Sequence, residues 1–340
     1  MKIAAYSVFP AEKPYFKRWS KEHQVEVKLI AAPLSQATLD EAAGCVGVCV
    51  QQPSALGDAA FYRRFAQMGL KYIGVRSAGI DFVDLAACQK NGIKVTNVPA
   101  YSPRAIAEMG LTQALALLRR LGEYRAEMAQ GKFSLNPRLI SNEIYKLTVG
   151  LIGLGHIGGE TARLYRALGA RVIAYNRSHK VQYESVVEYT DFATVIAQSD
   201  IISLHTPLTP ATNGMIGEEE FRKMKDSAIL INMSRGGLVD TPALITALQH
   251  GQIAGAGLDT LANEAEFFRK DVPVDQLPAD YQTLAAMPNV IITPHIAFYT
   301  ATAVKNIVNI GLDNIYRQEI KKKLINPLSF YNLNAKIMAT

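Results

Sequence analysis

Short apolar runs alternate with amphipathic segments along the first hundred residues of the chain. The apolar runs at residues 3–8, 25–31, 46–50, 72–75 and 94–97 have the length and composition of buried strands. Between them, residues 59–67 and 82–90 space their apolar side chains at helical intervals. Strands that alternate with helices in this way predict a parallel, doubly wound α/β domain.

A second series of apolar runs begins near the middle of the chain. Residues 147–152 form a β-type run that leads into Gly153-Leu154-Gly155-His156-Ile157-Gly158, a helical pattern at residues 157–168 and another β-type run at residues 172–175. In this spacing the first glycine allows a tight turn, the second lets the backbone approach a pyrophosphate, and the third lets the helix pack on the strand. The sequence therefore predicts a dinucleotide-binding β-α-β unit.

Further runs extend this second sheet, and two connections set the domain boundaries. Strands are expected at residues 201–204, 228–232, 253–258 and 290–293, and helices at residues 218–224 and 241–250. A proline-rich stretch at residues 98–103 precedes an apolar helix at residues 104–121, and a helical segment at residues 301–316 has no strand partner left in its own sheet. We therefore predict a discontinuous substrate domain of residues 1–100 plus 299–333, a Rossmann domain of residues 101–298, and a cleft between them.

Composition and charge narrow the class of protein. The 340 residues are 49% hydrophobic and 19% charged, the formal net charge is +6, and the only local basic run is Lys321-Lys322-Lys323. Nucleic-acid binding would need basic residues gathered on one face, and a membrane span would need about 20 apolar residues, so neither partner is expected. Cys45, Cys49 and Cys88 show no metal-ligand spacing and no signal peptide precedes them. We expect buried free thiols in a cytoplasmic protein without a metal.

Three residues with complementary chemistry follow strands of the second half. Arg235 comes after the strand at residues 228–232, Glu264 lies beyond the strand at residues 253–258, and His295 follows the last strand. A fixed cation that holds a carboxylate, a titrating imidazole and a carboxylate that orients it suit hydride transfer to a 2-keto acid. His23, His179 and His250 lie in polar segments and are expected at the surface; His156 lies in the glycine loop, and His205 lacks an adjacent acid.

These motifs together resemble the D-isomer-specific 2-hydroxyacid dehydrogenases. The resemblance rests on the glycine loop, on residues 232–240, on Gly257-Leu258-Asp259 with Glu264, and on Thr293-Pro294-His295. Residues 98–103 and 295–300 are similar to the D-lactate dehydrogenase branch, of the lactic acid bacterial and vancomycin-resistance type. The resemblance implies a flavodoxin-like catalytic domain, a Rossmann coenzyme domain and a homodimer.

The resemblance also implies roles for individual residues. Arg235 would bind the substrate carboxylate and carbonyl, His295 would be the acid/base, and Glu264 would pair with His295. Additional substrate contacts are implied for Ala78, Gly79, Tyr101 and Tyr299. The positions implied to contact the cofactor are Gly153, Gly155, His156, Ile157, Gly158, Asn176, Arg177, Ser178, Thr206, Pro207, Thr212, Met233, Ser234, Arg235 and Asp259.

The end of the second strand of the β-α-β unit bears on the choice of cofactor. Many NAD-binding units carry an acidic residue there that bonds the ribose 2′-hydroxyl, whereas this chain has Asn176, followed by Arg177 and Ser178. Because an arginine can pair with a 2′-phosphate and no carboxylate repels it, we expect NADPH to be preferred over NADH. In the alternative, Arg177 faces solvent and Asn176 bonds the ribose of NAD.

The sequence leaves the size of the substrate open. Comparable D-lactate dehydrogenases place a tryptophan where this chain has Leu135, so a longer 2-keto acid would fit unless Phe133 or Phe298 fills the space. We expect pyruvate or a similar small 2-keto acid as substrate and a D-2-hydroxy acid as product. The alternatives are a dehydrogenase of bulkier acids, such as 2-ketoisocaproate or phenylpyruvate, and a dinucleotide-sensing corepressor of the same fold.

Overall fold

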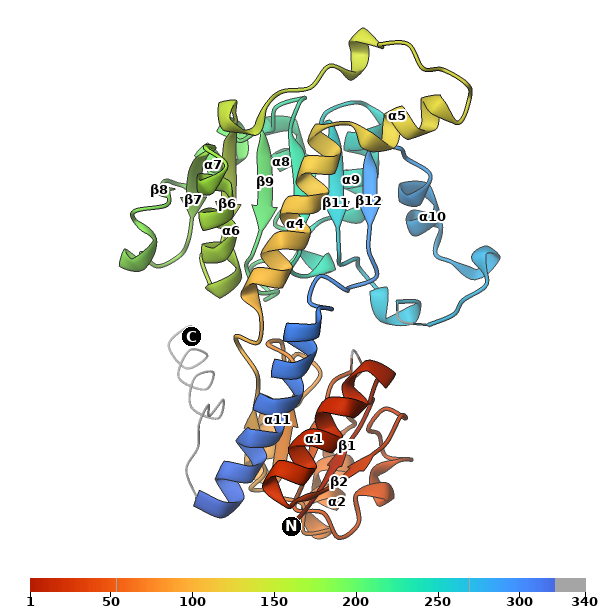
Figure 1. The fold of residues 1–340 in the computed structure, drawn as a ribbon, viewed down its shortest axis with the longest axis vertical. Helices are drawn as coiled ribbons and strands as arrows, with labels where there is room; N and C mark the ends of the chain where they lie inside the picture. Colours follow the sequence, from red (N-terminus) through yellow and green to blue (C-terminus); the bar gives the residue numbers. More distant parts are fainter. Residues whose placement is uncertain (53, 269, 322–340) are drawn as a thin grey trace. The chain divides into compact units, whose positions relative to one another are not determined.

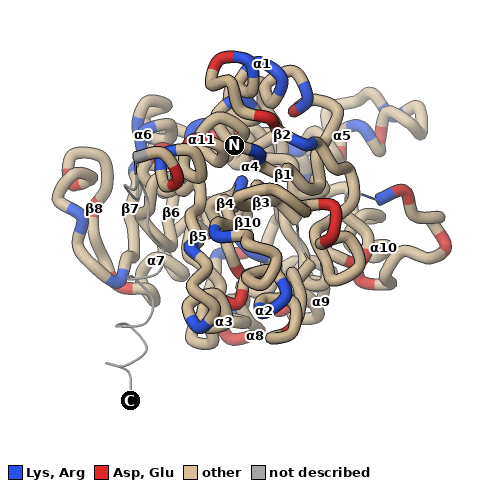
Figure 2. The backbone as a smooth tube through the Cα atoms, turned by 90° about the horizontal axis from the view of Figure 1, so that it is seen from below, with Lys and Arg blue, Asp and Glu red and all other residues tan. Residues whose placement is uncertain are grey.

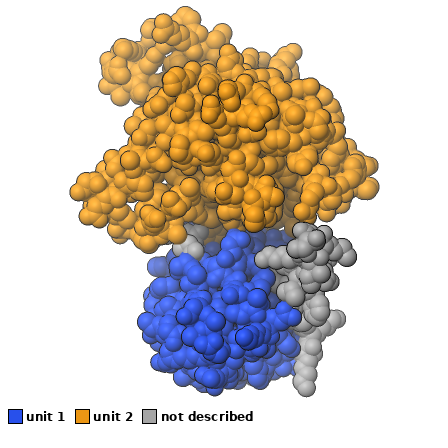
Figure 3. Space-filling view, turned by 180° about the vertical axis from the view of Figure 1, so that it is seen from behind, with its two compact units in different colours: residues 1–102, 299–340 blue, residues 103–298 orange. Residues whose placement is uncertain are grey.

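The computed structural model describes residues 1–52, 54–268 and 270–321. The chain forms two compact units, which are coloured separately in Figure 3. The first consists of Met1–Ser102 and the segment from Tyr299 onward, and the second of Pro103–Phe298. The expected end of the first domain at residue 333, and Lys322 and Lys323 of the basic run, lie outside the described residues.

The first unit is built on a five-stranded parallel sheet (Figure 1). Its strand order, β2-β1-β3-β4-β5, is that of flavodoxin-like folds. Because the strand order reverses at β1, the crossover that leads to β2 lies on one face of the sheet, and the crossovers that lead to β4 and β5 lie on the other. The strands are β1 (Lys2–Ala5), β2 (Glu26–Leu29), β3 (Gly47–Val50), β4 (Tyr72–Val75) and β5 (Lys94–Thr96).

Helices cover both faces of this first sheet. The helices are α1 (Lys13–His23), α2 (Ala59–Gln67), α3 (Leu85–Lys90) and α11 (Ala301–Lys321). Phe16 and Trp19 of α1 share one apolar cluster with Leu312 of α11, and the two helices lie side by side in Figure 1. The opposite face holds a second cluster, to which α2 contributes Phe61 and Phe65. The C-terminal helix is therefore part of the core of the first unit.

The second unit contains a seven-stranded parallel sheet of order β12-β11-β10-β9-β6-β7-β8. Read from β8, this is the Rossmann order with one further strand, and it reverses between β6 and β9. The strands are β6 (Thr148–Ile152), β7 (Arg171–Tyr175), β8 (Glu188–Tyr189), β9 (Ile201–Leu204), β10 (Ile229–Asn232), β11 (Gly255–Leu258) and β12 (Val290–Ile292). Two parallel-sheet α/β domains were predicted, and this fold class is confirmed.

The α-helices of the second unit are α4 (Pro103–Leu118), α5 (Leu121–Met128), α6 (His156–Ala167), α7 (Phe192–Gln198), α8 (Glu218–Lys223), α9 (Thr241–Gln249) and α10 (Ala279–Ala285). The sequence pattern did not indicate α5, α7 and α10 as separate helices. The single helix expected at residues 104–121 is wrong in its C-terminal part. The chain leaves α4 at Leu118, and Arg120 takes a left-handed conformation with φ +51° before α5 begins.

Other observations on the described residues bear on the class of protein. In the view of Figure 2, Lys and Arg positions and Asp and Glu positions are both scattered along the backbone. A search of the described helices finds none with the length and apolar character to cross a membrane. Cys45, Cys49 and Cys88 are buried free thiols, as expected.

Candidate active site

The glycine loop leaves space for a ligand at the N-terminus of α6. Gly153 has φ +99°, and a Cβ there would lie 2.6 Å from the carbonyl oxygen of His205. A Cβ on Gly158 would lie 2.2 Å from the carbonyl oxygen of Gly153, whereas one on Gly155 would meet nothing within 4 Å. No side chain caps α6 at Gly155. The crowded glycines shape the turn, and the first-turn N–H groups beside Gly155 suit the pyrophosphate of a dinucleotide.

Asn176, which directly follows β7, forms hydrogen bonds that hold the glycine loop. Its Oδ1 accepts a hydrogen bond of 2.8 Å from the Leu154 amide, and its Nδ2 donates to the Ser178 carbonyl. The side chain therefore already links the glycine loop to the segment that follows β7. Arg177 and Ser178 are exposed, and Arg177 forms no ion pair with any residue that the structure describes.

The loops after β9 and β10 are joined next to the glycine loop. The Ser234 hydroxyl donates a 2.6 Å hydrogen bond to the carbonyl of Thr206, and Asn232 donates one of 2.8 Å to the carbonyl of Arg235. His205 pairs through Nε2 with Ser203, at 2.9 Å, while its buried Nδ1 bonds no described residue. Burial lowers the pKa of His205 to about 4, so this imidazole is neutral at pH 7.

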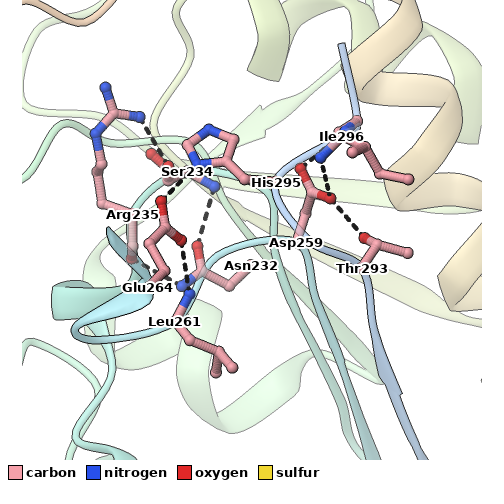
Figure 4. A network of polar contacts seen from close by, with 10 residues as sticks. Asn232, Ser234, Arg235, Asp259, Leu261, Glu264, Thr293, His295 and Ile296 are labelled. Carbon is pink, nitrogen blue, oxygen red and sulfur yellow. Dashed lines mark hydrogen bonds and ion pairs between the residues drawn. The ribbon is translucent and has the colours of Figure 1, made fainter. Parts of the chain in front are cut away.

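The three residues with complementary chemistry meet in one polar network (Figure 4). His295 Nδ1 lies 2.5 Å from Glu264 Oε1, and Glu264 Oε2 accepts a 3.0 Å hydrogen bond from the Leu261 amide. Arg235 follows β10 and donates a 2.8 Å hydrogen bond to the Ser234 carbonyl. The side chains of His295 and Glu264 are 30% and 20% exposed, so the pair is accessible to a small ligand.

Asp259 binds residues on both sides of His295. It is 1% exposed, and it accepts hydrogen bonds from the Thr293 hydroxyl and from the amides of Ile296 and Ala297. Burial raises the pKa of this carboxyl, and the three hydrogen bonds act in the opposite direction. His295 itself has φ +55°, a left-handed conformation that disfavours a residue with a side chain. The resemblance implies for Asp259 only a contact with the cofactor, and that contact stays a prediction.

The remaining cofactor candidates line the carboxyl ends of the second sheet. Thr206, Pro207 and Thr212 follow β9, and the Thr212 hydroxyl donates to the Pro207 carbonyl at 2.7 Å. Met233 is buried directly after β10. His156 and Ile157 begin α6. Ligands of open α/β sheets bind at the carboxyl ends of the parallel strands, so these residues lie where a cofactor would bind. Their individual contacts with a cofactor stay predictions.

The candidate substrate residues Ala78, Gly79, Tyr101 and Tyr299 all belong to the first unit. The loop after β4 is held from within, because the Ser77 hydroxyl donates to the Gly79 carbonyl and Asn97 donates to the Ala78 carbonyl. Asn306 of α11 donates a 2.7 Å hydrogen bond to the Tyr101 carbonyl. Tyr299 is 51% exposed.

One expectation about the other histidines is wrong. His23 was expected at the surface, but it is partly buried and stacks on Trp19 with ring centroids 4.1 Å apart. The cause is the helix α1, which the sequence pattern did not indicate because it buries only Phe16 and Trp19. His179 and His250 are exposed, as expected. Among the described residues, no cluster of His, Cys, Asp and Glu suits a metal ion.

Comparisons with known proteins indicate the same family that the sequence motifs resemble. Residues 111–297 match the model of the D-isomer specific 2-hydroxyacid dehydrogenase, NAD binding domain. A D-lactate/D-glycerate dehydrogenase of Pediococcus acidilactici is 41% identical over 92% of this chain and 95% of its own length. A D-lactate dehydrogenase of Lactiplantibacillus plantarum is 38% identical over 92% and 95%.

Solved structures agree with this result. The NAD-complexed D-isomer specific 2-hydroxyacid dehydrogenase of Lactobacillus delbrueckii ssp. bulgaricus superposes with a TM-score of 0.89 at 48% identity, covering 96% of this chain and 100% of that one. A D-2-hydroxyisocaproate dehydrogenase superposes with a TM-score of 0.88 at 34% identity, covering 97% and 100%.

Proposed function

The chain belongs to the D-isomer-specific 2-hydroxyacid dehydrogenase family, and on this premise we propose that it reduces pyruvate or a similarly small 2-keto acid to the D-2-hydroxy acid. As a member it is an oxidoreductase, a D-2-hydroxyacid dehydrogenase. The observation that carries the proposal is the contact between His295 and Glu264 in one network with Arg235. The names of the relatives from Pediococcus acidilactici and Lactiplantibacillus plantarum support D-lactate as the product.

The chemistry divides among the three residues of this network. Arg235 is a permanent cation whose planar fork suits the substrate carboxylate, and it polarises the carbonyl. A bound nicotinamide supplies the hydride to the keto carbon. His295 supplies the proton to the carbonyl oxygen, and because Glu264 engages Nδ1, we assign that proton to Nε2. The Glu264 carboxylate, in contact with Nδ1, fixes the orientation of the imidazole ring.

The substrate carboxylate also needs contacts from the first unit in this proposal. The backbone amides of Ala78 and Gly79 would receive it, and Tyr101 and Tyr299 would border the substrate. What supports these roles is that all four residues belong to the unit that complements the dinucleotide-binding unit. Residues 1–100 with 299–333 thus form the proposed substrate domain, and residues 101–298 the coenzyme domain.

For the cofactor, the glycine loop fits a nicotinamide dinucleotide, and we propose NADPH as the preferred form. The support is local: Asn176 replaces an acidic residue and is engaged by the loop, while Arg177 and Ser178 are exposed beside it. Arg177 would pair with the 2′-phosphate and Ser178 would donate a hydrogen bond to it. The opposing consideration is that a relative from Clostridioides difficile is named a D-2-hydroxyacid dehydrogenase (NAD(+)).

A second candidate function is the reduction of bulkier 2-keto acids. The superposition on a D-2-hydroxyisocaproate dehydrogenase favours it, and so does Leu135 in place of a larger side chain. Leu135 and Phe133 are 92% and 77% exposed in the single chain, so neither fills a pocket of its own chain there.

We also propose a cytoplasmic homodimer that binds neither nucleic acid nor membranes. Large apolar side chains are exposed on α5 and the segment after it, a pattern that soluble monomers avoid. They are Leu121, Met128, Phe133, Leu135, Ile140 and Tyr145. A groove of about 730 Å³ lies between α5 and the α10–β12 segment. We propose that a second copy of the chain occupies this groove. Light scattering after size-exclusion chromatography measures the molar mass in solution and so tests whether the protein is a dimer.

The proposed function is tested by a matrix of substrates and cofactors. Pyruvate, 2-ketoisocaproate and phenylpyruvate are each assayed with NADH and with NADPH, and the configuration of the product is determined. The expected result is the highest kcat/KM for pyruvate with NADPH and a D-configured product. Phenylpyruvate as the best substrate would favour the second candidate, and an L-configured product or no reduction of any 2-keto acid would overturn both.

The cofactor assignment has its own matched pair of variants. Arg177→Ala should lower kcat/KM for NADPH by about 10-fold or more and leave NADH nearly unchanged, because only NADPH carries the phosphate. Arg222→Ala removes an exposed arginine of α8 in the same unit and should change neither. A parent enzyme that prefers NADH, or equal effects of Arg177→Ala on both cofactors, would mean that Arg177 faces solvent and does not bind the 2′-phosphate.

A further inference from the structure

A buried ion pair lies under the carboxyl ends of the first sheet. Arg76, the residue directly after β4, is 0% exposed, and its Nε lies 3.1 Å from Oε1 of Glu12, which is 2% exposed. Glu12 ends a short 3-10 helix (Pro10–Glu12), and its Oε2 also accepts a 2.9 Å hydrogen bond from the Phe9 amide. The ring of Phe16 faces the guanidinium, with its centroid 5.2 Å from Cζ.

The guanidinium of Arg76 joins three neighbouring strands. Its Nη1 donates a 2.7 Å hydrogen bond to the Cys49 carbonyl in β3, and its Nη2 donates to the carbonyls of Tyr6 and Ser7, which follow β1, at 3.0 and 3.3 Å. Its own amide donates to the Val50 carbonyl at 2.8 Å. One side chain thus fixes the ends of β1 and β3 against the end of β4, which is where the loop of residues 77–79 begins.

Stability alone does not account for this pair. Removing two charges from water is unfavourable, and a buried ion pair can often be replaced by apolar side chains of similar volume without loss of stability. What the pair supplies is geometry, because a planar fork with several fixed donors orders the carbonyls that it binds. The fold also makes room for it, since a Cβ on Gly311 of α11 would lie 3.1 Å from Arg76 Cγ.

The loop that starts at Arg76 is held on its far side as well. Asn97 donates a 2.8 Å hydrogen bond to the Ala78 carbonyl, and Asn314 of α11 donates one of 2.9 Å to the Asn97 carbonyl. The Val98 amide donates to the Ser77 carbonyl at 3.1 Å. With both ends anchored, the amides of Ala78 and Gly79 have a defined direction.

We propose that the buried Arg76–Glu12 pair is a positioning element for the 2-keto acid: it fixes the backbone from which Ala78 and Gly79 present their amides to the substrate carboxylate. The inference rests on the proposed function, because the role of those two amides does. Neither Arg76 nor Glu12 touches substrate in this account. They act through the loop by holding its backbone in one position, because small displacements of groups that bind a substrate strongly reduce the rate.

The test is Arg76→Lys, which keeps the charge opposite Glu12 but cannot reach three carbonyls at once. KM for pyruvate should rise by about 10- to 100-fold, whereas KM for the nicotinamide cofactor, proposed to bind in the other unit, should change by less than about twofold. Arg64→Lys is the matched control, because Arg64 is a partly exposed arginine of the same unit that pairs with Asp40 at the protein surface. It should leave both KM values unchanged.

Two further variants keep the test decisive. Glu12→Gln should reproduce the split between the two KM values, and if it or Arg76→Lys fails to fold, the double replacement of Glu12 by Leu and Arg76 by Met removes both charges together. Folded variants with an unchanged KM for pyruvate, or with both KM values raised equally, would overturn the proposal. If none of the three folds, the pair determines folding and the positioning role is overturned. A parent without 2-keto acid reduction would instead overturn the proposed function, and this role with it.

Discussion

Replacing Asp259 by asparagine should disconnect His295 from its support. The buried carboxylate accepts three hydrogen bonds, from the Thr293 hydroxyl and the amides of Ile296 and Ala297. An amide side chain offers one oxygen and turns an NH₂ group toward the remaining donors. Hydrogen bonds to charged groups contribute about 1.5–3 kcal/mol each, so losing one or two of them should lower the free energy of unfolding of the second unit by roughly 2–4 kcal/mol.

The same change should reach catalysis through the backbone of His295. Its φ of +55° costs about 1–2 kcal/mol, and without the hydrogen bonds on both sides the residue relaxes toward an ordinary conformation. A displacement of the imidazole by about 1 Å is enough to lower kcat by about 100-fold. The assays are thermal unfolding of the protein without cofactor, where a decrease in Tm of about 5–10 °C is expected, and kcat for pyruvate at saturating cofactor.

A matched control separates this effect from the loss of any aspartate. Asp191 caps α7 and accepts hydrogen bonds from the amide and hydroxyl of Thr194 at the exposed start of that helix. Asp191→Asn should change Tm only slightly, since asparagine is an equally good N-cap, and should leave kcat unchanged. If Asp259→Asn retained the Tm and the kcat of the parent, the carboxylate would not be what holds His295 in place.

Further predictions concern Arg235, Glu264 and the buried imidazole of His205. Arg235→Lys should lower kcat/KM by about 100-fold, with both KM and kcat affected, because lysine lacks the planar fork; parent-like kinetics would place the substrate carboxylate elsewhere. Glu264→Gln should lower kcat for reduction, because the ring of His295 loses the carboxylate that orients it, and a parent-like kcat would separate the two residues. The pKa of His205 is about 4 in the folded protein and near 6.5 when unfolded, so stability should fall as pH falls from about 6.5 to about 4, with a slope of up to about one proton. His205→Asn should remove that part of the pH dependence of Tm, and an identical dependence in the variant would contradict the burial effect.

What the sequence predicted well depends on neighbours along the chain. The glycine loop and most strands of the two sheets are local patterns. The strands β4 and β9 have the predicted bounds, the other predicted strands differ at one or both ends by one to three residues, and only the two-residue strand β8 was not predicted. Arg235, Glu264 and His295 could be found because the topology of a parallel sheet brings its strand ends to one edge.

What the sequence did not predict depends on distant contacts or weak local signals. The helix α1 buries only Phe16 and Trp19 among charged residues, and α10 buries only Leu284, so neither shows a continuous apolar face. Arg76 and Glu12 lie 64 positions apart, and each would ordinarily be read as a surface charge. Asp259 and Thr293 are 34 positions apart, and only the folded sheet shows that they form one support for His295.

We propose that His295 delivers the proton during reduction of a small 2-keto acid. The most direct test compares initial rates of pyruvate reduction by the parent and by His295→Gln at neutral pH, with saturating cofactor and with Tm measured for both. We expect both proteins to fold equally well and the rate of the variant to be about 10²- to 10⁴-fold lower, because proton delivery is lost while Arg235 remains. A folded His295→Gln variant that reduces pyruvate at the rate of the parent would contradict it.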